Sequence, residues 1–162
     1  MTHHIIYIST AIHPMTDEEL SIILEESRKW NYDHGITGML LYVEGIFVSS
    51  GKRDIESGKA GRFMQILEGT EEEVKKIFNK IKEDKRHINV TPLINSTATG
   101  RYFESWQMGF RALSNADLKE NSAFFSPDIV FARESDADLS NPLNFIRSFY
   151  LRGQSQQTIF QR

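Results

Sequence analysis

Apolar residues, in places alternating with polar ones, predict five β-strands in this chain. Strands show a two-residue period because successive side chains point to opposite faces of a sheet. In the first predicted strand this period places Tyr7 on the same face as Ile5 and Ser9. The second predicted strand is apolar almost throughout, which is typical of a strand covered on both faces. The five strands are His4–Ser9, Ile36–Val43, Phe63–Glu68, Ile88–Ile94 and Tyr102–Ala112.

Two amphipathic helices are predicted between these strands. Thr16 and Glu19 form a capping-box pattern at the start of a helix over Asp17–Trp30. Thr70 and Glu73 repeat the pattern before a second helix, whose apolar stripe consists of Val74, Ile77, Phe78 and Ile81. The order β-α-β-β-α-β-β predicts an α+β, ferredoxin-like fold, in which a five-stranded mixed sheet carries both helices on one face.

The chain beyond Leu113 predicts a helical extension over residues 113–153, followed by a tail over residues 154–162. Asn141 as N-cap, Pro142 at the first helical position and Gly153 just past the end bracket an apolar helix. We expect this helix to cover the sheet face that the two main helices leave open. That face would otherwise expose a large apolar patch.

Composition narrows the class of protein. Hydrophobic residues make up 40% of the chain and charged residues 25%, as in ordinary globular domains. The net charge of −3 supplies no positive field for a nucleic-acid partner. Without cysteine, disulfides and thiolate metal sites are excluded. No apolar run reaches the length of a membrane span, so we expect a cytoplasmic protein with no membrane partner.

Signals of catalysis are weak, and two polar residues stand out instead. The Gly58-Lys59-Ala60 stretch fails as a phosphate-binding loop because Ala60 replaces the Ser or Thr that would hold magnesium. Gln65 lies in the middle of an apolar strand, where an amide without hydrogen-bond partners costs about 1–3 kcal/mol. From the residues alone, Gln65 and Tyr7 are either satisfied core side chains or partners in a reaction.

A set of segments, specific only when taken together, occurs in a familiar order. The segments are Ile22–Asn31, Gly35–Tyr42, Phe63–Gly69, Asp84–His87 and Trp106–Met108. They resemble the BLUF domains, which sense blue light with a bound flavin, and the resemblance covers residues 1–112. It implies an oxidised flavin, FAD or FMN, between the two main helices, which makes the helix-covered face of the sheet the flavin side.

The resemblance also implies roles for single residues. Tyr7 would donate an electron and a proton to the photoexcited flavin, and Gln65 would bridge Tyr7 and the flavin edge. Asn31 would bind the O4/N3 side of the flavin, and Trp106 and Met108 would lie near Gln65. The photoreaction would leave the Gln65 amide rearranged and the absorption shifted slightly to the red. Other positions would line the ring or hold the ribityl chain and phosphate, namely Ile23, Ser27, Lys80, Asp84, Arg86 and His87.

Two features depart from the family pattern. Trp30 occupies a position where the family often has a smaller polar or imidazole side chain, and it could stack on the flavin or its adenine, or lie on the solvent side of the helix. The segment Val48–Arg62 lengthens the connection between the second and third strands. A hairpin extension that surface loops tolerate is the expectation for this segment, and a partner-binding role is the alternative.

The resemblance predicts a photoreceptor that signals to a protein partner through a changed surface and is not itself an enzyme. A dark flavin-dependent enzyme and a ferredoxin-like ligand-binding regulatory module are the alternatives, although the chain lacks an evident nucleophile, metal cluster or paired catalytic carboxylates. We also expect a homo-oligomer, because the C-terminal helices carry more apolar surface than one thin layer needs to bury.

Overall fold

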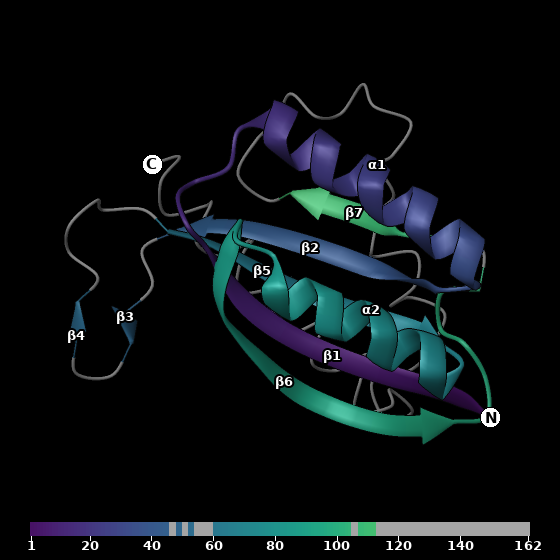
Figure 1. Ribbon diagram of the computed structural model, residues 1–162. Coiled ribbons are helices and arrows are strands. Elements are labelled where there is room, and N and C mark those ends of the chain that lie inside the picture. The colour runs from purple at the N-terminus through teal and green to yellow at the C-terminus, as the bar shows by residue number, and fades with distance from the viewer. Residues whose placement is uncertain (46–47, 50–51, 54–59, 105–106, 113–162) are drawn as a thin grey trace, which may run out of the picture.

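A computed structural model describes residues 1–45, 48–49, 52–53, 60–104 and 107–112. In this part of the chain, two helices lie over a five-stranded sheet, and a short two-stranded hairpin projects from one end (Figure 1). The elements are β1 (Thr2–Ala11), α1 (Asp17–His34), β2 (Thr37–Gly45), β3 (Val48–Ser49), β4 (Lys52–Arg53), β5 (Ala60–Gly69), α2 (Glu71–Glu83), β6 (His87–Ala98) and β7 (Gly109–Ala112).

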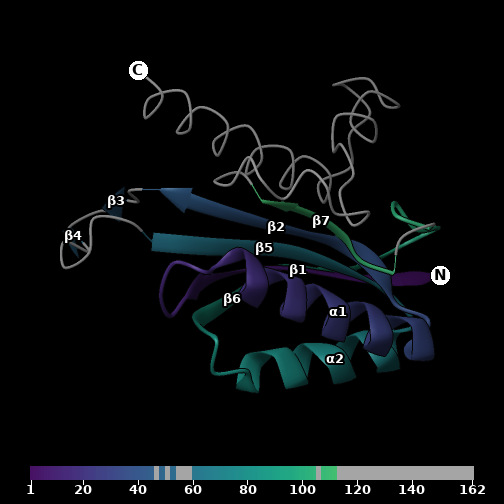
Figure 2. The same ribbon diagram turned by 90° about the horizontal axis from the view of Figure 1, so that it is seen from above.

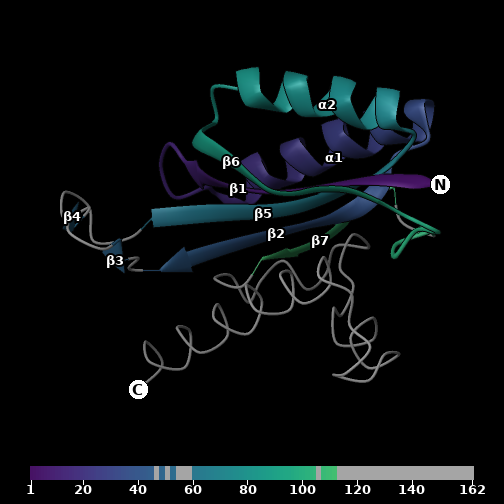
Figure 3. The ribbon, with the colours of Figure 1, turned by 90° about the horizontal axis from the view of Figure 1, so that it is seen from below.

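The sheet has the strand order β6-β1-β5-β2-β7. β5 pairs antiparallel with both β1 and β2, whereas β7 runs parallel to β2, so the sheet is mixed. The register aligns Tyr7 with Gln65 and Gln65 with Leu40 in one row across its centre. Both helices cover the same face (Figures 2 and 3). The predicted α+β fold with a five-stranded mixed sheet is confirmed.

Local signals at the helix ends explain where α1 and α2 begin and stop. The Thr16 side chain accepts a hydrogen bond from the Glu19 amide, and the Glu19 side chain accepts one from the Thr16 amide, which completes the predicted capping box. α1 ends at Gly35, whose φ of 62° lies in the left-handed region that favours glycine. Thr70 caps α2 through the Glu73 amide alone.

The core lies between the helices and the sheet. Side chains such as Ile5, Leu20, Leu67 and Val74 are buried there, from β1, α1, β5 and α2 respectively. The opposite face of the sheet is also apolar and buried, and includes Ile6, Leu41 and Ile66. The C-terminal helices and tail predicted over residues 113–162 lie outside the described residues.

The predicted strand Tyr102–Ala112 is wrong in its extent, since β7 spans only Gly109–Ala112. The amides of Tyr102 and Phe103 donate to the carboxylate of Glu68 at 2.9 and 3.1 Å. Because these donors are used by a side chain, the chain turns here before it joins the sheet.

The connection predicted over Val48–Arg62 is also shorter than expected. The β3–β4 hairpin lies within it, but β5 already begins at Ala60, which pairs with Gly45 of β2. The connection between the two paired strands is therefore residues 46–59.

Candidate functional site

A cavity opens between α1, α2 and the centre of the sheet. It encloses about 780 Å³ of empty space, counting the part open to solvent. α1 contributes the face that recurs at positions 23, 26, 27, 30 and 31, which is the spacing of one side of a helix. The nine residues predicted to bind the cofactor all line this cavity, namely Tyr7, Ile23, Ser27, Asn31, Gln65, Lys80, Asp84, Arg86 and His87.

The floor of the cavity carries a chain of hydrogen bonds across the sheet. Tyr7 donates its phenolic hydrogen to Oε1 of Gln65 at 2.5 Å. Nε2 of Gln65 donates to the Met108 sulfur at 3.3 Å. Tyr7 is 3% exposed and Gln65 4%, so neither exchanges its partner for bulk water. The strand register explains the first contact, because Tyr7 and Gln65 are directly opposite each other on β1 and β5.

The environment of Tyr7 keeps its hydroxyl protonated. Burial raises the pKa of the Tyr7 phenol above its usual value, and the negative charge of Asp84 adds to the rise. The ring packs against Phe78 and His87, with centroids 5.5 and 6.3 Å away. Tyr7 is therefore a neutral hydrogen-bond donor held in one position.

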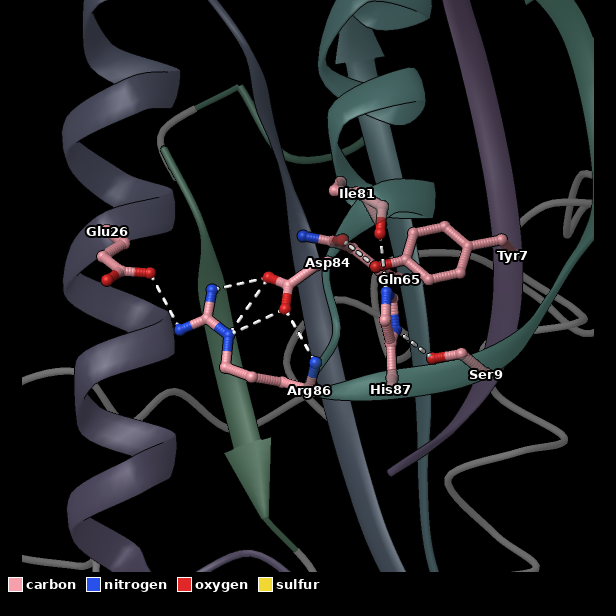
Figure 4. A network of polar contacts seen from close by, with 8 residues as sticks. All are labelled: Tyr7, Ser9, Glu26, Gln65, Ile81, Asp84, Arg86 and His87. Atoms are coloured by element: carbon pink, nitrogen blue, oxygen red, sulfur yellow. Dashed lines mark hydrogen bonds and ion pairs between the residues drawn. The ribbon is translucent and has the colours of Figure 1, made fainter. Parts of the chain in front are cut away.

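His87 lines the cavity and is held between β1 and the end of α2 (Figure 4). Its Nδ1 lies 2.8 Å from the Ser9 hydroxyl, and its Nε2 lies 2.7 Å from the carbonyl oxygen of Ile81. Nε2 must donate to the carbonyl, and in the neutral imidazole Nδ1 then accepts from Ser9. Ser9 is buried and does not line the cavity, which places this Ser–His pair out of position for attack on a ligand there.

α1 also holds the chain that leads into β7. Asn31, 1% exposed, donates from Nδ2 to the carbonyl oxygen of Gln107 at 2.6 Å. Arg28 donates from Nε to the carbonyl oxygen of Met108 at 3.1 Å. The Met108 sulfur lies beside Gln65, as the resemblance implies, whereas Trp106 lies outside the described residues.

Charged side chains gather at the outer end of the cavity. Arg86 bonds to Asp84 through Nε and Nη2 and forms an ion pair with Glu26 through Nη1 (Figure 4). Although burial opposes it, hydrogen bonds from Arg86 hold the pKa of Asp84 below its usual value. The hydrogen bond to Asp84, together with Glu26, raises the pKa of Arg86 despite partial burial. Both groups are therefore charged at neutral pH.

Trp30 lines the same cavity rather than lying wholly on the solvent side of α1. Its ring stacks on His34 at 3.9 Å, and the ammonium group of Lys80 lies 4.0 Å from the ring centroid. Among the described residues its indole nitrogen is buried without a hydrogen-bond partner. A ligand in the cavity with a hydrogen-bond acceptor beside Trp30 would satisfy the indole N–H.

The residues present fit a flavin. Apolar side chains wall the cavity, and the amide of Gln65 on its floor suits the polar edge of a planar ring. Lys80 and Arg86 supply cations for an anionic tail, beside the carboxylates of Glu26 and Asp84. Sequence reasoning missed several lining residues: Glu26, Leu40, Phe63, Leu67, Ile77 and Ile81. Helix and strand periodicity could have found all of them except Leu40, since each of the others shares a face of its element with a predicted site residue. Leu40 comes to the cavity through its pairing with Gln65 across β2 and β5.

Neither a metal site nor a membrane-spanning helix is found in the part of the chain that the structure describes. No group of three or more His, Cys, Asp or Glu residues there is placed to hold a metal ion. None of the described helices is both long enough and apolar enough to span a bilayer.

Comparison with known proteins agrees with this geometry. A family model described as "BLUF: Sensors of blue-light using FAD" matches residues 2–50 and 57–109. Photoactivated adenylate cyclase subunit beta of Euglena gracilis is 32% identical over 99 residues, which are 61% of this chain and 10% of that protein. The subunit alpha-like protein FB of the same organism is 35% identical over 99 residues, 61% of this chain and 8% of that protein. The chain thus spans about a tenth or less of these relatives.

Solved structures give the same picture. A bacterial light-regulated adenylyl cyclase is 33% identical, with a TM-score of 0.56 over 73% of this chain and 30% of that chain. BlrB, a BLUF protein in its dark state, is 23% identical with a TM-score of 0.59 over 95% of this chain and 96% of that chain, a likeness that shows the fold. With a family model matching well over half of its residues, the chain belongs to the BLUF family of blue-light sensors.

Proposed function

We propose that Tyr7, Gln65 and Met108 form the switch through which this blue-light sensor responds. The single observation that carries the proposal is the buried 2.5 Å hydrogen bond from Tyr7 to Gln65 on the floor of the cavity. When bound, the flavin supplies the absorption of blue light and an excited state that accepts an electron. The protein's part is to supply a donor, to direct its proton and to keep water away from both.

Tyr7 suits the part of donor because its electron and proton leave together. At neutral pH, removal of a proton from a tyrosine of pKa about 10 costs about 4 kcal/mol, and burial raises that cost further for Tyr7. Loss of an electron makes the phenol strongly acidic, so its proton moves along the existing bond to Oε1 of Gln65.

Gln65 is the side chain whose hydrogen bonds can stay changed after the electron and proton have moved. Its amide has a donor end on the Met108 sulfur and an acceptor end on Tyr7. Rearrangement of the amide exchanges those ends and breaks the contact with Met108, which stands next to β7. Since Arg28 and Asn31 hold the same stretch of chain, the change reaches the edge of the sheet.

The cofactor is FAD or FMN in this proposal. The family description specifies FAD, and the structure of Klebsiella pneumoniae BlrP1 was solved with FMN. Arg86 and Lys80 at the outer end of the cavity suit the phosphate that both flavins carry.

We propose that the output is a changed contact with a signalling protein and that this domain is a sensor without catalysis of its own. The curated relatives are named as photoactivated cyclases, which supports light-dependent control of an effector. The homo-oligomer and the cytoplasmic location stay predictions.

Substitution of Gln65 by leucine tests the proposed relay. The variant keeps a similar volume, so we expect flavin binding within a few-fold of the wild type and no red-shifted state after blue light. Flavin fluorescence should stay partly quenched because Tyr7 is still present. A Gln65→Leu protein that forms the red-shifted state would contradict the proposal, and absorption spectra before and after illumination decide between the two results.

A further inference from the structure

The outer end of the cavity carries two oppositely charged side chains, one from α1 and one from the residues after α2. Glu26 on α1 is 60% exposed in its side chain and Arg86, after α2, is 41% exposed. Tyr7 and Gln65 on the floor are only 3% and 4% exposed. Glu26 and Arg86 therefore lie at the solvent end of the cavity, and Tyr7 and Gln65 lie at its deep end. Figure 4 shows Glu26 reaching from α1 toward Arg86.

Two carboxylates bind different nitrogen atoms of the Arg86 guanidinium group. Asp84 accepts from the Arg86 backbone amide at 2.9 Å, from Nε at 3.0 Å and from Nη2 at 2.6 Å. Glu26 contacts Nη1 at 2.9 Å. Asp84 therefore fixes the orientation of Arg86, and Glu26 covers the end that Asp84 leaves.

The charges at this end of the cavity cancel. Lys80 and Arg86 each carry one positive charge, and Asp84 and Glu26 each carry one negative charge. A flavin without a phosphate group needs no charge here. A phosphate monoester carries about −1.5 to −2 charges at pH 7 and would compete with Glu26 for Nη1 of Arg86.

We propose that Glu26 is a specificity-determining residue that restrains the preference of this site for phosphate-bearing flavins over riboflavin. It does so by occupying Nη1 of Arg86 and by placing a carboxylate beside the phosphate position. The inference rests on the proposed function, because a flavin must occupy the cavity.

The neutral variant Glu26→Gln should shift this preference in a known direction. It removes a repulsive charge and weakens the contact with Nη1, because a neutral amide oxygen accepts less strongly than a carboxylate, while Asp84 keeps Arg86 in place. For an exposed pair of this kind we expect the ratio of the riboflavin Kd to the FMN Kd to rise about three- to tenfold. Riboflavin affinity itself should stay within about twofold, because riboflavin has no group at this end that senses the charge.

Titration of the flavin-free, full-length chain with riboflavin and with FMN, followed by flavin fluorescence, measures both constants. Glu25→Gln is the matched control, since Glu25 is exposed on the same helix, does not line the cavity and gives the same change in net charge. In 0.5 M NaCl the effect of Glu26→Gln should shrink, as expected for a screened interaction. Glu26→Ala, which lacks the amide, should change the ratio in the same direction.

An unchanged ratio in Glu26→Gln, or an equal rise in Glu25→Gln, would overturn the role of Glu26. If riboflavin binds the wild type but Glu26→Gln leaves the ratio of the two Kd values unchanged, the proposed flavin site still holds and only the role of Glu26 is refuted. If neither flavin binds the wild type, the proposed function is itself contradicted and the inference with it.

Discussion

Replacement of Tyr7 by phenylalanine removes one hydroxyl group from the centre of the site. The ring and its contacts with Phe78 and His87 remain, but Gln65 loses the donor 2.5 Å from its oxygen. A buried acceptor left without its partner costs about 1–3 kcal/mol, partly offset because the phenol no longer has to be desolvated. We expect a net loss of about 1–2 kcal/mol in the free energy of unfolding.

Such a loss leaves the protein folded. For a chain of this length it corresponds to a fall of about 2–8 °C in Tm. Flavin binding should persist, whereas the red-shifted state should not form, because no donor for electron and proton remains beside Gln65. The excited flavin should also fluoresce more brightly and for longer than in the wild type.

Tyr42→Phe is the matched control for this experiment. Tyr42 is a second buried tyrosine, whose hydroxyl accepts from the Met15 amide at 2.7 Å and donates to Glu44 at 2.9 Å, and it does not line the cavity. It should lose similar stability and keep its red shift. A Tyr7→Phe protein with a normal red shift would refute the reasoning, whatever its Tm.

Three further outcomes are expected. Glu68→Leu should lower the free energy of unfolding by about 2–5 kcal/mol, because the buried amide of Phe103 and the partly buried amide of Tyr102 lose their acceptor, while the exposed control Glu72→Leu should change it little in urea titrations. Replacement of residues 46–59 by Asn-Gly should keep flavin binding and the red shift, since the strands already pair at their ends; loss of the flavin would place that segment in the site. Stability should fall as pH rises above about 10, where the unfolded chain releases phenol protons that Tyr7 and Tyr42 retain in the fold. Urea midpoints measured from pH 9 to 11 check this, and Tyr7→Phe should show a shallower fall.

Periodicity and capping signals allowed most of the fold to be predicted. The capping box at Thr16 and the glycine at position 35 locate the ends of α1 because they act through neighbouring backbone groups. Alternation in the first predicted strand puts Ile5 and Tyr7 on one face, and both lie in the core between the helices and the sheet. These features depend on residues close together in the chain, so the spacing of residue types in the sequence is enough to predict them.

Long-range side-chain contacts could not be predicted in this way. The alternation of apolar residues up to Phe110 predicts a long last strand, but Glu68, distant in sequence, takes the amides that the strand would have used. The contact of Glu26 with Arg86 is of the same kind, although periodicity places Glu26 on the cavity side of α1. An exposed glutamate on a helix gives no sign of the Arg86 that it meets across the cavity.

The most direct test of the account is an absorption spectrum of the purified full-length protein before and after blue light. We expect a yellow, flavin-bound protein whose absorption shifts slightly to the red on illumination and returns in the dark. A yellow protein with no reversible shift would contradict the switch at Tyr7 and Gln65, and a colourless protein that takes up no added flavin would contradict the flavin site itself.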